Sequence, residues 1–413
     1  MTDKLLALPN TSSSNSREFQ LSQGDLNFRV FSSVNDLVPD WETAQPPSNI
    51  YLQIPILKTI EQAPPKGIRP CYLIFYKNHQ PIGVAYCQVI NFKTDENVQD
   101  KEGHGKLKSI TASVKSFLAK QFEYNLLVCG NLLFTGEYGY YFDEAMVPQR
   151  MVAGILDEAL TKTQLFLKDK KIKIDGVFIK DIGEQKADCR QDLLDKKYRE
   201  FLFHPNMVLP IRPHWNTLED YLADVSSKYR VRAKKAFKCG HELEKVTLSL
   251  EQLKAHKDHL YELYKGVMET AGFNMVTLNE NYIVQLKENL GDLLTVTGYY
   301  LKSEMIGYRT NILNFHETEA HFLGYDQNYN KDYHLYMNML LDSLRHGIEL
   351  QVERVVYART AMEIKSTIGA EPEDLYCYIR ANNKLMNLIM PPILEYFRPD
   401  DNWIQRHPFK DNN

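Results

Sequence analysis

The sequence predicts an α/β protein made of two similar lobes. The chain has 413 residues, and a single hydrophobic core rarely grows to that size, so two cores are expected. Runs typical of strands alternate with runs typical of helices, and their order is the same in both halves. The 44% hydrophobic and 25% charged residues, with 25 Tyr and 19 Phe, are normal for a globular protein and exclude disorder over most of the chain.

The first half begins with a hairpin. Residues 71–77 are aromatic and branched, which is typical of a strand, and residues 82–92 form the returning strand. Apolar residues at 107, 110, 114, 117 and 118 have helical spacing, which predicts a helix at 107–122. The later elements expected are a strand at 125–130, a helix at 147–168, a strand at 173–180, a helix at 190–200 and a strand at 203–211.

The second half repeats this order. The elements expected are a hairpin at 293–302 and 305–315, a strand at 319–326, a polar loop, a helix at 334–347, a strand at 352–357, a short helix at 361–368 and a strand at 375–381. The two hairpins overlay at a shift of 224 residues, which places Tyr76 on Tyr300 and Gly83 on Gly307. This overlay, together with the shared order, predicts an internal duplication, although two unrelated hairpins would also fit.

These patterns divide the chain into four parts. We expect a polar N-terminal tail at 1–24, a first lobe at 25–212, a second lobe at 213–382, and a C-terminal helix and tail at 383–413. The net charge of −4 argues against a bulk nucleic-acid binder. The scattered cysteines, the short N-terminal apolar stretch and the lack of an 18-residue apolar run predict a cytoplasmic protein, with peripheral contact at the inner face of a membrane left open.

Three stretches resemble segments of FemAB-like proteins. They are residues 226–236 (SSKYRVRAKKA), 322–325 (FLGY) with the loop and helix after it, and 358–370 (ARTAMEIKSTIGA). The resemblance implies a duplicated GNAT fold, with two mixed sheets flanked by helices, over residues 26–381. It also implies an N-acyltransferase that moves an acyl group from acyl-CoA, as co-substrate, directly to an amine, which could belong to a lipid or a cell-envelope precursor. The second lobe would carry the activity.

Two other functions stay open at this point. The glycine-rich pyrophosphate loop usual in GNAT proteins is absent from both halves, and residues 326–333 contain no glycine. An aminoacyl-tRNA-dependent ligase of the FemABX type, which builds peptide bridges on a cell-wall precursor, is one alternative. A non-catalytic module that kept the fold to bind a ligand is the other.

A basic run is the clearest candidate for anion binding. Residues 226–238 contain six cations and no acid, and on a helix Lys228, Arg232 and Lys235 share one face. Like charges repel at this spacing, and a phosphate group would relieve the repulsion. A solvated helix face is the ordinary alternative. The candidate phosphate-binding residues are Lys228, Arg230, Arg232, Lys235 and, from a later segment, Arg359.

Three residues are candidates for the chemistry. An amine must lose a proton before it attacks an acyl carbon, and His321 has the side chain best suited to accept that proton near neutral pH. Tyr325 could donate a hydrogen bond to the developing oxyanion. Resemblance to the family's segment suggests that Lys365 lines the acceptor or acyl site. A lone histidine in a strand is more often structural. No spacing among the histidines or cysteines predicts a metal site.

Overall fold

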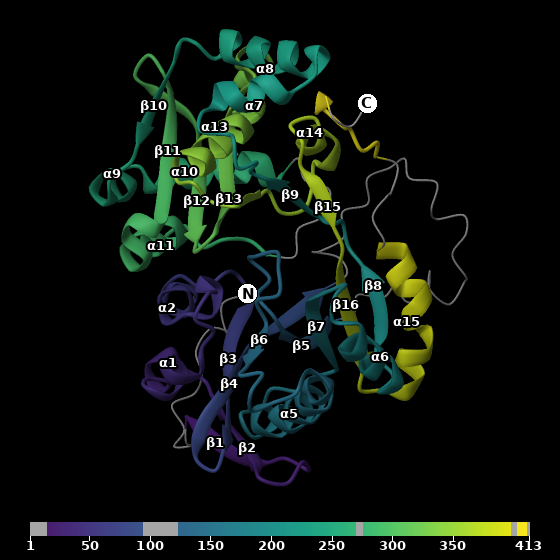
Figure 1. Ribbon diagram of the computed structural model, residues 1–413. Helices are drawn as coiled ribbons and strands as arrows, with labels where there is room; N and C mark the ends of the chain where they lie inside the picture. Colours follow the sequence, from purple (N-terminus) through teal and green to yellow (C-terminus); the bar gives the residue numbers. More distant parts are fainter. Residues whose placement is uncertain (1–14, 94–122, 270–275, 398–402, 411–413) are drawn as a thin grey trace.

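The computed structural model describes residues 15–93, 123–269, 276–397 and 403–410. They form two lobes, each with one mixed sheet covered by helices, so the expected α/β class is confirmed (Figure 1). The expected helix at 107–122 lies outside the described residues. Within them, no helix is both long and apolar enough to cross a bilayer.

The sheet of the first lobe has nine described strands, and a short strand, β6 (Tyr140–Phe142), pairs with β4 beside the main path. Strand β1 lies within the expected polar tail and pairs with β2. In spatial order the main path is β1 (Ser16–Gln20), β2 (Leu26–Phe31), β3 (Ile68–Lys77), β4 (Gln80–Lys93), β5 (Glu123–Cys129), β7 (Gly176–Gly183), β16 (Leu375–Ala381) and β8 (Arg199–Leu202).

The sheet of the second lobe has seven described strands. Its first four follow chain order, and its far edge combines strands from distant parts of the chain. In spatial order they are β10 (Leu243–Thr247), β11 (Leu294–Leu301), β12 (Glu304–Asn314), β13 (Glu317–Tyr325), β14 (Arg354–Val356), β9 (Asn206–Pro210) and β15 (Glu371–Glu373).

Helices cover both faces of each sheet. In the first lobe, α1 (Asp40–Ala44) and α2 (Ile54–Gln62) pack on one face, and α5 (Gln149–Asp169) and α6 (Ala187–Asp195) pack on the other. In the second lobe, one face carries α9 (Leu250–Ala255), α10 (Lys257–Met268) and α11 (Tyr282–Leu290). The opposite face carries α7 (Leu218–Asp224), α8 (Ser227–Cys239), α12 (Gln327–Tyr333), α13 (Leu335–Glu349) and α14 (Met362–Ser366).

Side-chain alternation explains how one strand serves two cores. On β3, Tyr72 and Ile74 point toward α1 and α2, whereas Leu73 and Phe75 point toward α5. The core on the α2 side continues across the boundary between the lobes, where α2 packs against α11. The lobes therefore share a hydrophobic interface, which makes them one packed unit.

Each sheet receives one strand from the other half of the chain. The expected lobes at 25–212 and 213–382 were contiguous, but β9 pairs with β14 in the second sheet, and β16 pairs with β7 in the first. An apolar strand pattern reports burial and carries no information about the pairing partner, so this exchange could not be read from the sequence. The C-terminal segment also crosses over, because α15 (Lys384–Phe397) packs on β16 whereas Phe409 enters the second core.

The two hairpins are related as the overlay predicts. The pairing of β3 with β4 shifts register between Phe75 and Tyr76, and the pairing of β11 with β12 shifts between Tyr299 and Tyr300. These positions coincide at the shift of 224 residues. A shared irregularity in register is a structural detail that two unrelated hairpins would not be expected to have in common.

Two further local expectations were wrong. The helix expected at 190–200 ends at Asp195, and strand β8 begins at Arg199. Residues 326–333, expected as a polar loop, contain the helix α12. The side chain of Asp326 caps this helix by accepting a hydrogen bond from the backbone N–H of Asn328. Tyr329 and Tyr333 lie one turn apart and pack against the core below. Residues 326–333 therefore form a capped amphipathic helix despite their polar composition.

Candidate active site

Each lobe contains one parallel strand pair among its described strands. In the first lobe β5 pairs with β7 over four residue pairs, ending at Cys129 and Ile179. In the second lobe β13 pairs with β14 over three residue pairs, ending at Glu319 and Val356. All the other described pairings are antiparallel. The surroundings of the parallel pair differ between the two lobes.

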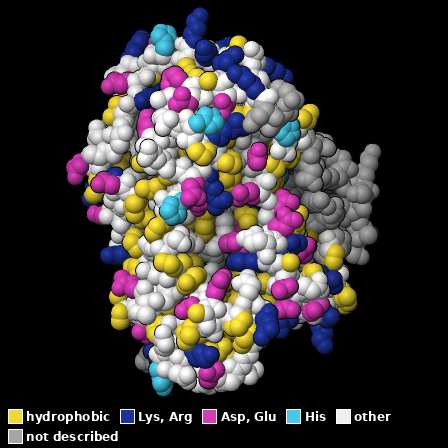
Figure 2. Space-filling model, in the orientation of Figure 1, with side chains coloured by type: hydrophobic (Ala, Val, Ile, Leu, Met, Phe, Trp, Pro, Cys, Tyr) yellow, Lys and Arg dark blue, Asp and Glu magenta, His cyan; other side chains and the backbone are white. Residues whose placement is uncertain are grey.

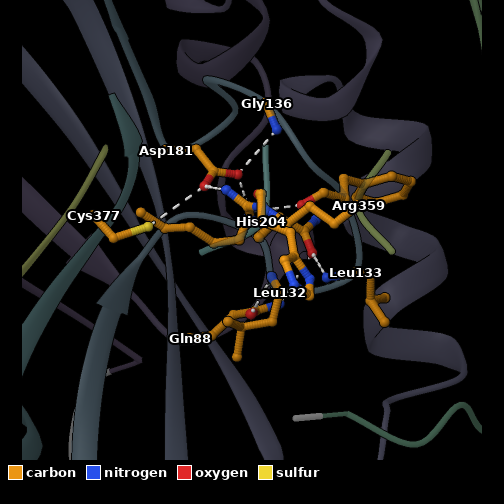
Figure 3. A network of polar contacts seen from close by, with 11 residues as sticks. Gln88, Leu132, Leu133, Gly136, Asp181, His204, Arg359 and Cys377 are labelled. Carbon is orange, nitrogen blue, oxygen red and sulfur yellow. Dashed lines mark hydrogen bonds and ion pairs between the residues drawn. The ribbon is translucent and has the colours of Figure 1, made fainter. Parts of the chain in front are cut away.

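In the first lobe a buried charged network lies beyond the pair (Figure 3). Asp181 is 1% exposed and accepts hydrogen bonds from the Lys180 ammonium and from the backbone N–H of Gly136. Lys180 also donates to the carbonyl of Phe134 at 2.7 Å. The positive charges beside Asp181 outweigh its burial and lower the pKa of its carboxyl group. The space beyond the first parallel pair is therefore filled by its own side chains and loop.

Arg359, predicted to bind phosphate, belongs to this network. Its guanidinium donates to Asp181 at 2.6 Å and to the carbonyl of His204 at 2.8 Å. The thiol of Cys377 lies beside the same carboxylate, and burial raises its pKa to about 12. Arg359 thus connects the second lobe to the first through a buried ion pair, and its charge is already compensated.

In the second lobe the two parallel strands separate. Opposite Thr310, β13 contains a bulge at His321 and Phe322. The Thr310 hydroxyl accepts from the backbone N–H of Phe322 at 3.0 Å and donates to its carbonyl at 2.7 Å. A bulge bends its strand. β14 meanwhile extends its pairing with β9 through Tyr357 and leaves β13 after Glu319.

The bulge places His321 at the boundary between the lobes. Its ring stacks on Phe134 of the first lobe with 4.6 Å between ring centroids. Nε2 lies 2.9 Å from the hydroxyl of Tyr282, and Nδ1 lies 3.6 Å from Glu319. Burial lowers the pKa of His321, against the opposing effect of Glu319, which favours the neutral imidazole. Glu319 is also buried, and its second oxygen, Oε2, has no partner among the described residues.

Tyr325 and Lys365 lie elsewhere. Tyr325 is on the opposite face of β13, where it packs near Tyr336 of α13. Lys365, on α14, donates to the carbonyls of Tyr357, Ala358 and Arg359 at 2.6–3.1 Å. Burial lowers its pKa to about 7. The structure therefore does not bring the three predicted catalytic side chains together.

The segment that Lys365 holds has an unusual backbone. Ala358, Thr360 and Ala361 all have positive φ angles, of 55°, 71° and 48°. Such angles are costly for residues other than glycine and need support from their surroundings. The ammonium group of Lys365 provides that support, because it has three N–H donors and faces three carbonyls.

The basic run forms α8, as expected for a helix. Ala233 and Ala236 are buried, and the amide of Asn338 on α13 donates to the carbonyl of Ala236. The cations, including Lys228, Arg230, Arg232 and Lys235, point away from this contact, and none of them forms an ion pair with another described residue. Figure 2 shows Lys and Arg side chains gathered at the top of the molecule, over α8.

These cations lie beside the start of α13. His334 begins that helix in the left-handed conformation, with φ of 49°. Its pKa is lowered first by burial and then by the charges of Lys235 and Arg232. Helix α13 therefore starts in a positively charged environment.

A cleft of about 960 Å³ lies between the lobes. Tyr138 of the first lobe donates to Glu317 of the second at 3.3 Å, and Arg354 also pairs with Glu317 at 2.8 Å. Glu317 and Val356 line the cleft and belong to the parallel pair of the second lobe. The hollow is visible between the lobes in Figure 2, with acidic side chains around it.

Sequence reasoning missed most of this cleft. Its two walls come from segments about 180 residues apart, and no local motif marks them. A signal was present only for the buried network of the first lobe, because Lys180 and Asp181 interrupt an otherwise apolar strand, GVFIKDIG. Among the described residues, no group of His, Cys, Asp or Glu is arranged to hold a metal ion.

Comparison with known proteins gives a result at the level of fold. No protein-family model and no curated protein matches the chain. Among solved structures, FemX is similar, with a TM-score of 0.52, 10% identity, and coverage of 91% of this chain and 99% of that chain. A tandem GNAT protein from the clavulanic acid biosynthesis pathway has a TM-score of 0.49 at 12% identity, covering 87% and 99%. The chain therefore has the fold of FemX, a duplicated GNAT-type fold of the FemAB-like kind.

Proposed function

We propose that this protein transfers an acyl group from a phosphate-bearing donor, with acyl-CoA as the first candidate, to an amine. The observation that carries the proposal is the separation of β13 from β14 at the bulge. The parallel pair borders the inter-lobe cleft, which Glu317 and Val356 line, and β13 leads through α12 to the start of α13. The closed network of the first lobe favours the second lobe as the active one.

The residues of α8 fit the phosphate part of such a donor. Arg232 and Lys235 lie near the start of α13, are exposed, and have no ion-pair partner among the described residues. Phosphate oxygens would compensate them. The missing glycine-rich loop is replaced by α12, so the anion would be held mainly by side chains.

The chemistry needs no covalent enzyme intermediate. The amine nitrogen bonds to the acyl carbon, the carbon–sulfur bond of the donor breaks, and the proton lost by the amine ends on the departing thiolate. His321, buried and neutral beside Glu319, is the base we assign to this proton. Tyr325, predicted to donate to the oxyanion, lies on the face of β13 opposite to His321, so we do not assign it to the same acyl carbon. We assign positioning roles to Lys365 and Arg359, because both are engaged by buried partners.

A second donor is favoured by one feature of α8. Six cations without an acid on a 13-residue helix also suit the repeated phosphates of RNA, as in an aminoacyl-tRNA-dependent transferase. The fold likeness does not separate the two donors. RNA binding would weaken steeply with salt, whereas a single CoA would respond less.

A thermal-shift titration tests the proposal. A ligand at about 100 times its dissociation constant stabilises the folded state by about 2.7 kcal/mol. We expect stabilisation by acetyl-CoA or palmitoyl-CoA, and loss of it in Arg232→Glu/Lys235→Glu. The control is Lys58→Glu/Lys302→Glu, which makes the same charge change at exposed positions away from α8. Stabilisation by tRNA alone would favour the aminoacyl-tRNA-dependent transferase. No stabilisation by any donor would contradict acyl transfer and favour a non-catalytic binding module.

A further inference from the structure

The inter-lobe cleft is strongly acidic. Six carboxylates line it against one lysine and one arginine, an excess of four that equals the formal net charge, −4, of the whole 413-residue chain. All the other residues of the chain together therefore have a formal net charge of zero. The lining charges are Glu137, Glu184, Glu317, Glu353, Glu373, Asp374, Lys186 and Arg354.

Internal pairing leaves part of this charge uncompensated. Lys186 pairs with Glu137 at 3.0 Å, and Arg354 is shared between Glu317 and Glu373. Glu184 and Asp374 are exposed and form no ion pair with any other described residue. Carboxylates gathered around a concave surface focus the field within it, which attracts cations and repels anions.

A second observation does not depend on the carboxylates. Asn206 lines the cleft, is 5% exposed, and its Oδ1 accepts no hydrogen bond from the described residues. A buried carbonyl oxygen without a donor is costly, so a ligand that supplies an N–H would be favoured there. An ammonium group carries only donors and fits both the oxygen and the carboxylates.

The cleft also contains aromatic surface. Tyr138, Tyr141 and Phe315 belong to its lining. Aromatic faces attract ammonium groups and pack well against the methylene chains between them. The volume of about 960 Å³ is at the upper end of ligand pockets, and is far larger than one small amine fills.

We infer that the acceptor is an extended amine with two or more positive charges, bound along this cleft. One nitrogen would reach the parallel pair where Glu317 and Val356 line the cleft, and the other ammonium groups would be held by Glu184, Asp374 and Asn206. The identification as an acceptor rests on the proposed acyl transfer, whereas the binding of a polycation does not. A linear polyamine and a short lysine peptide share this chemistry.

Isothermal titration calorimetry on the full chain tests the binding. We expect spermine or tetralysine to bind at least tenfold more tightly than butylamine, and ADP, which carries two phosphates, to give no heat at this site. The tighter of the two polycations identifies the source, because spermine lacks a peptide backbone. Equal affinity for butylamine and both polycations would overturn the inference.

A pair of variants localises the site. Glu184→Gln/Asp374→Asn removes two exposed charges from the cleft, and we expect roughly a 3- to 30-fold loss of polycation affinity at low salt. Glu242→Gln/Asp258→Asn removes the same charge from exposed positions outside the cleft and should leave affinity within about twofold. Equal losses in both pairs would show nonspecific attraction and contradict the proposal.

Binding and turnover fail separately. If spermine binds in the cleft but no donor is turned over, the polycation site stands and the acyl transfer is wrong. If a monoamine is acylated as fast as spermine and the cleft variants have no effect on KM, the acyl transfer stands and the polycation site is wrong.

Discussion

The two parallel strand pairs of this molecule have the same topology and opposite surroundings. In the first lobe the pair β5–β7 leads into a buried network in which Lys180 and Arg359 both contact Asp181. In the second lobe the pair β13–β14 separates at a bulge and borders an acidic cleft. A duplicated fold can thus leave one parallel pair beside a cleft and use the equivalent position to join its halves.

The largest effect is expected from breaking the buried charged network beside the parallel pair of the first lobe. Asp181→Asn removes the carboxylate that compensates two buried cations, and loss of one partner of a buried ion pair costs about 3–5 kcal/mol. Urea denaturation should show a correspondingly lower free energy of unfolding. Asp188→Asn, the same change at an exposed position in the first turn of α6, is the control and should cost less than about 1 kcal/mol. An unchanged Asp181→Asn midpoint would mean that the network does not hold the lobes together.

The next largest effect is expected from the segment that Lys365 holds, which places Arg359 beside Asp181 of the first lobe. Lys365→Met leaves three carbonyls without their donor, at a cost of about 2–4 kcal/mol in the free energy of unfolding. Lys331→Met is the matched change at an exposed site. If Lys365 only positions this segment, Lys365→Arg should restore part of the stability, and a catalytic role would instead show as lost turnover in a fully stable variant.

Removing the support of the bulge in β13 should have a smaller effect on stability and a specific effect on donor binding. Thr310→Val removes the hydroxyl that satisfies both backbone groups of Phe322, which costs about 1–3 kcal/mol. The donor-induced thermal shift should weaken with it. Thr318→Val is an unusually close control, since Thr318 is fully buried on the same strand as Phe322 and its hydroxyl has no partner among the described residues. A similar loss in both variants would contradict a special role for the bulge.

The smallest effect is a difference in acid sensitivity between the lobes. Burial, with a contribution from Arg309, lowers the pKa of His346 on α13 to about 4, and burial also lowers that of His321. The unfolded chain takes up protons at these positions below about pH 6.5, so the stability they contribute is lost as the pH falls from about 6.5 to 4.

Hydrogen exchange at pH 7 and pH 5 should detect this effect. We expect the free energy of opening of the second lobe to be lower by about 1–2 kcal/mol at pH 5 than at pH 7. The variant His346→Gln should remove part of this difference. His241→Gln, at an exposed histidine of the same lobe, should leave the pH dependence intact. Equal acid sensitivity of both lobes would argue against this origin.

The sequence predicted elements better than their association. The strands around Leu73 and Ile306 were recognisable because branched and aromatic residues alternate between two buried faces. The repeat was visible at Tyr76 and Tyr300, where the register shifts in both hairpins. These signals are local, and local burial is what a sequence pattern records.

The roles of the candidate site residues stay predictions, and the structure shows only where those residues lie. The sequence singled out His321, and the structure places it at the boundary between the lobes. It could not show that Arg359 meets Asp181, or that Tyr138 meets Glu317, because those pairs join segments nearly 180 residues apart. The sequence analysis singled out Lys365 for the chemistry. Its three carbonyl partners could not be predicted, because they face the ammonium group only through the conformation of the turn at Ala358.

The exchange of β9 and β16 also constrains the order in which the protein can mature on the ribosome. The first sheet lacks an interior strand, between β7 and β8, until residues 375–381 have been synthesised. The amino-terminal half therefore leaves the exit tunnel with an unfilled position in its sheet, and that position stays unfilled until β16 emerges. Nascent chains arrested before residue 375 should remain sensitive to protease in both halves, whereas chains long enough to place residue 413 outside the tunnel should acquire resistance in a single step.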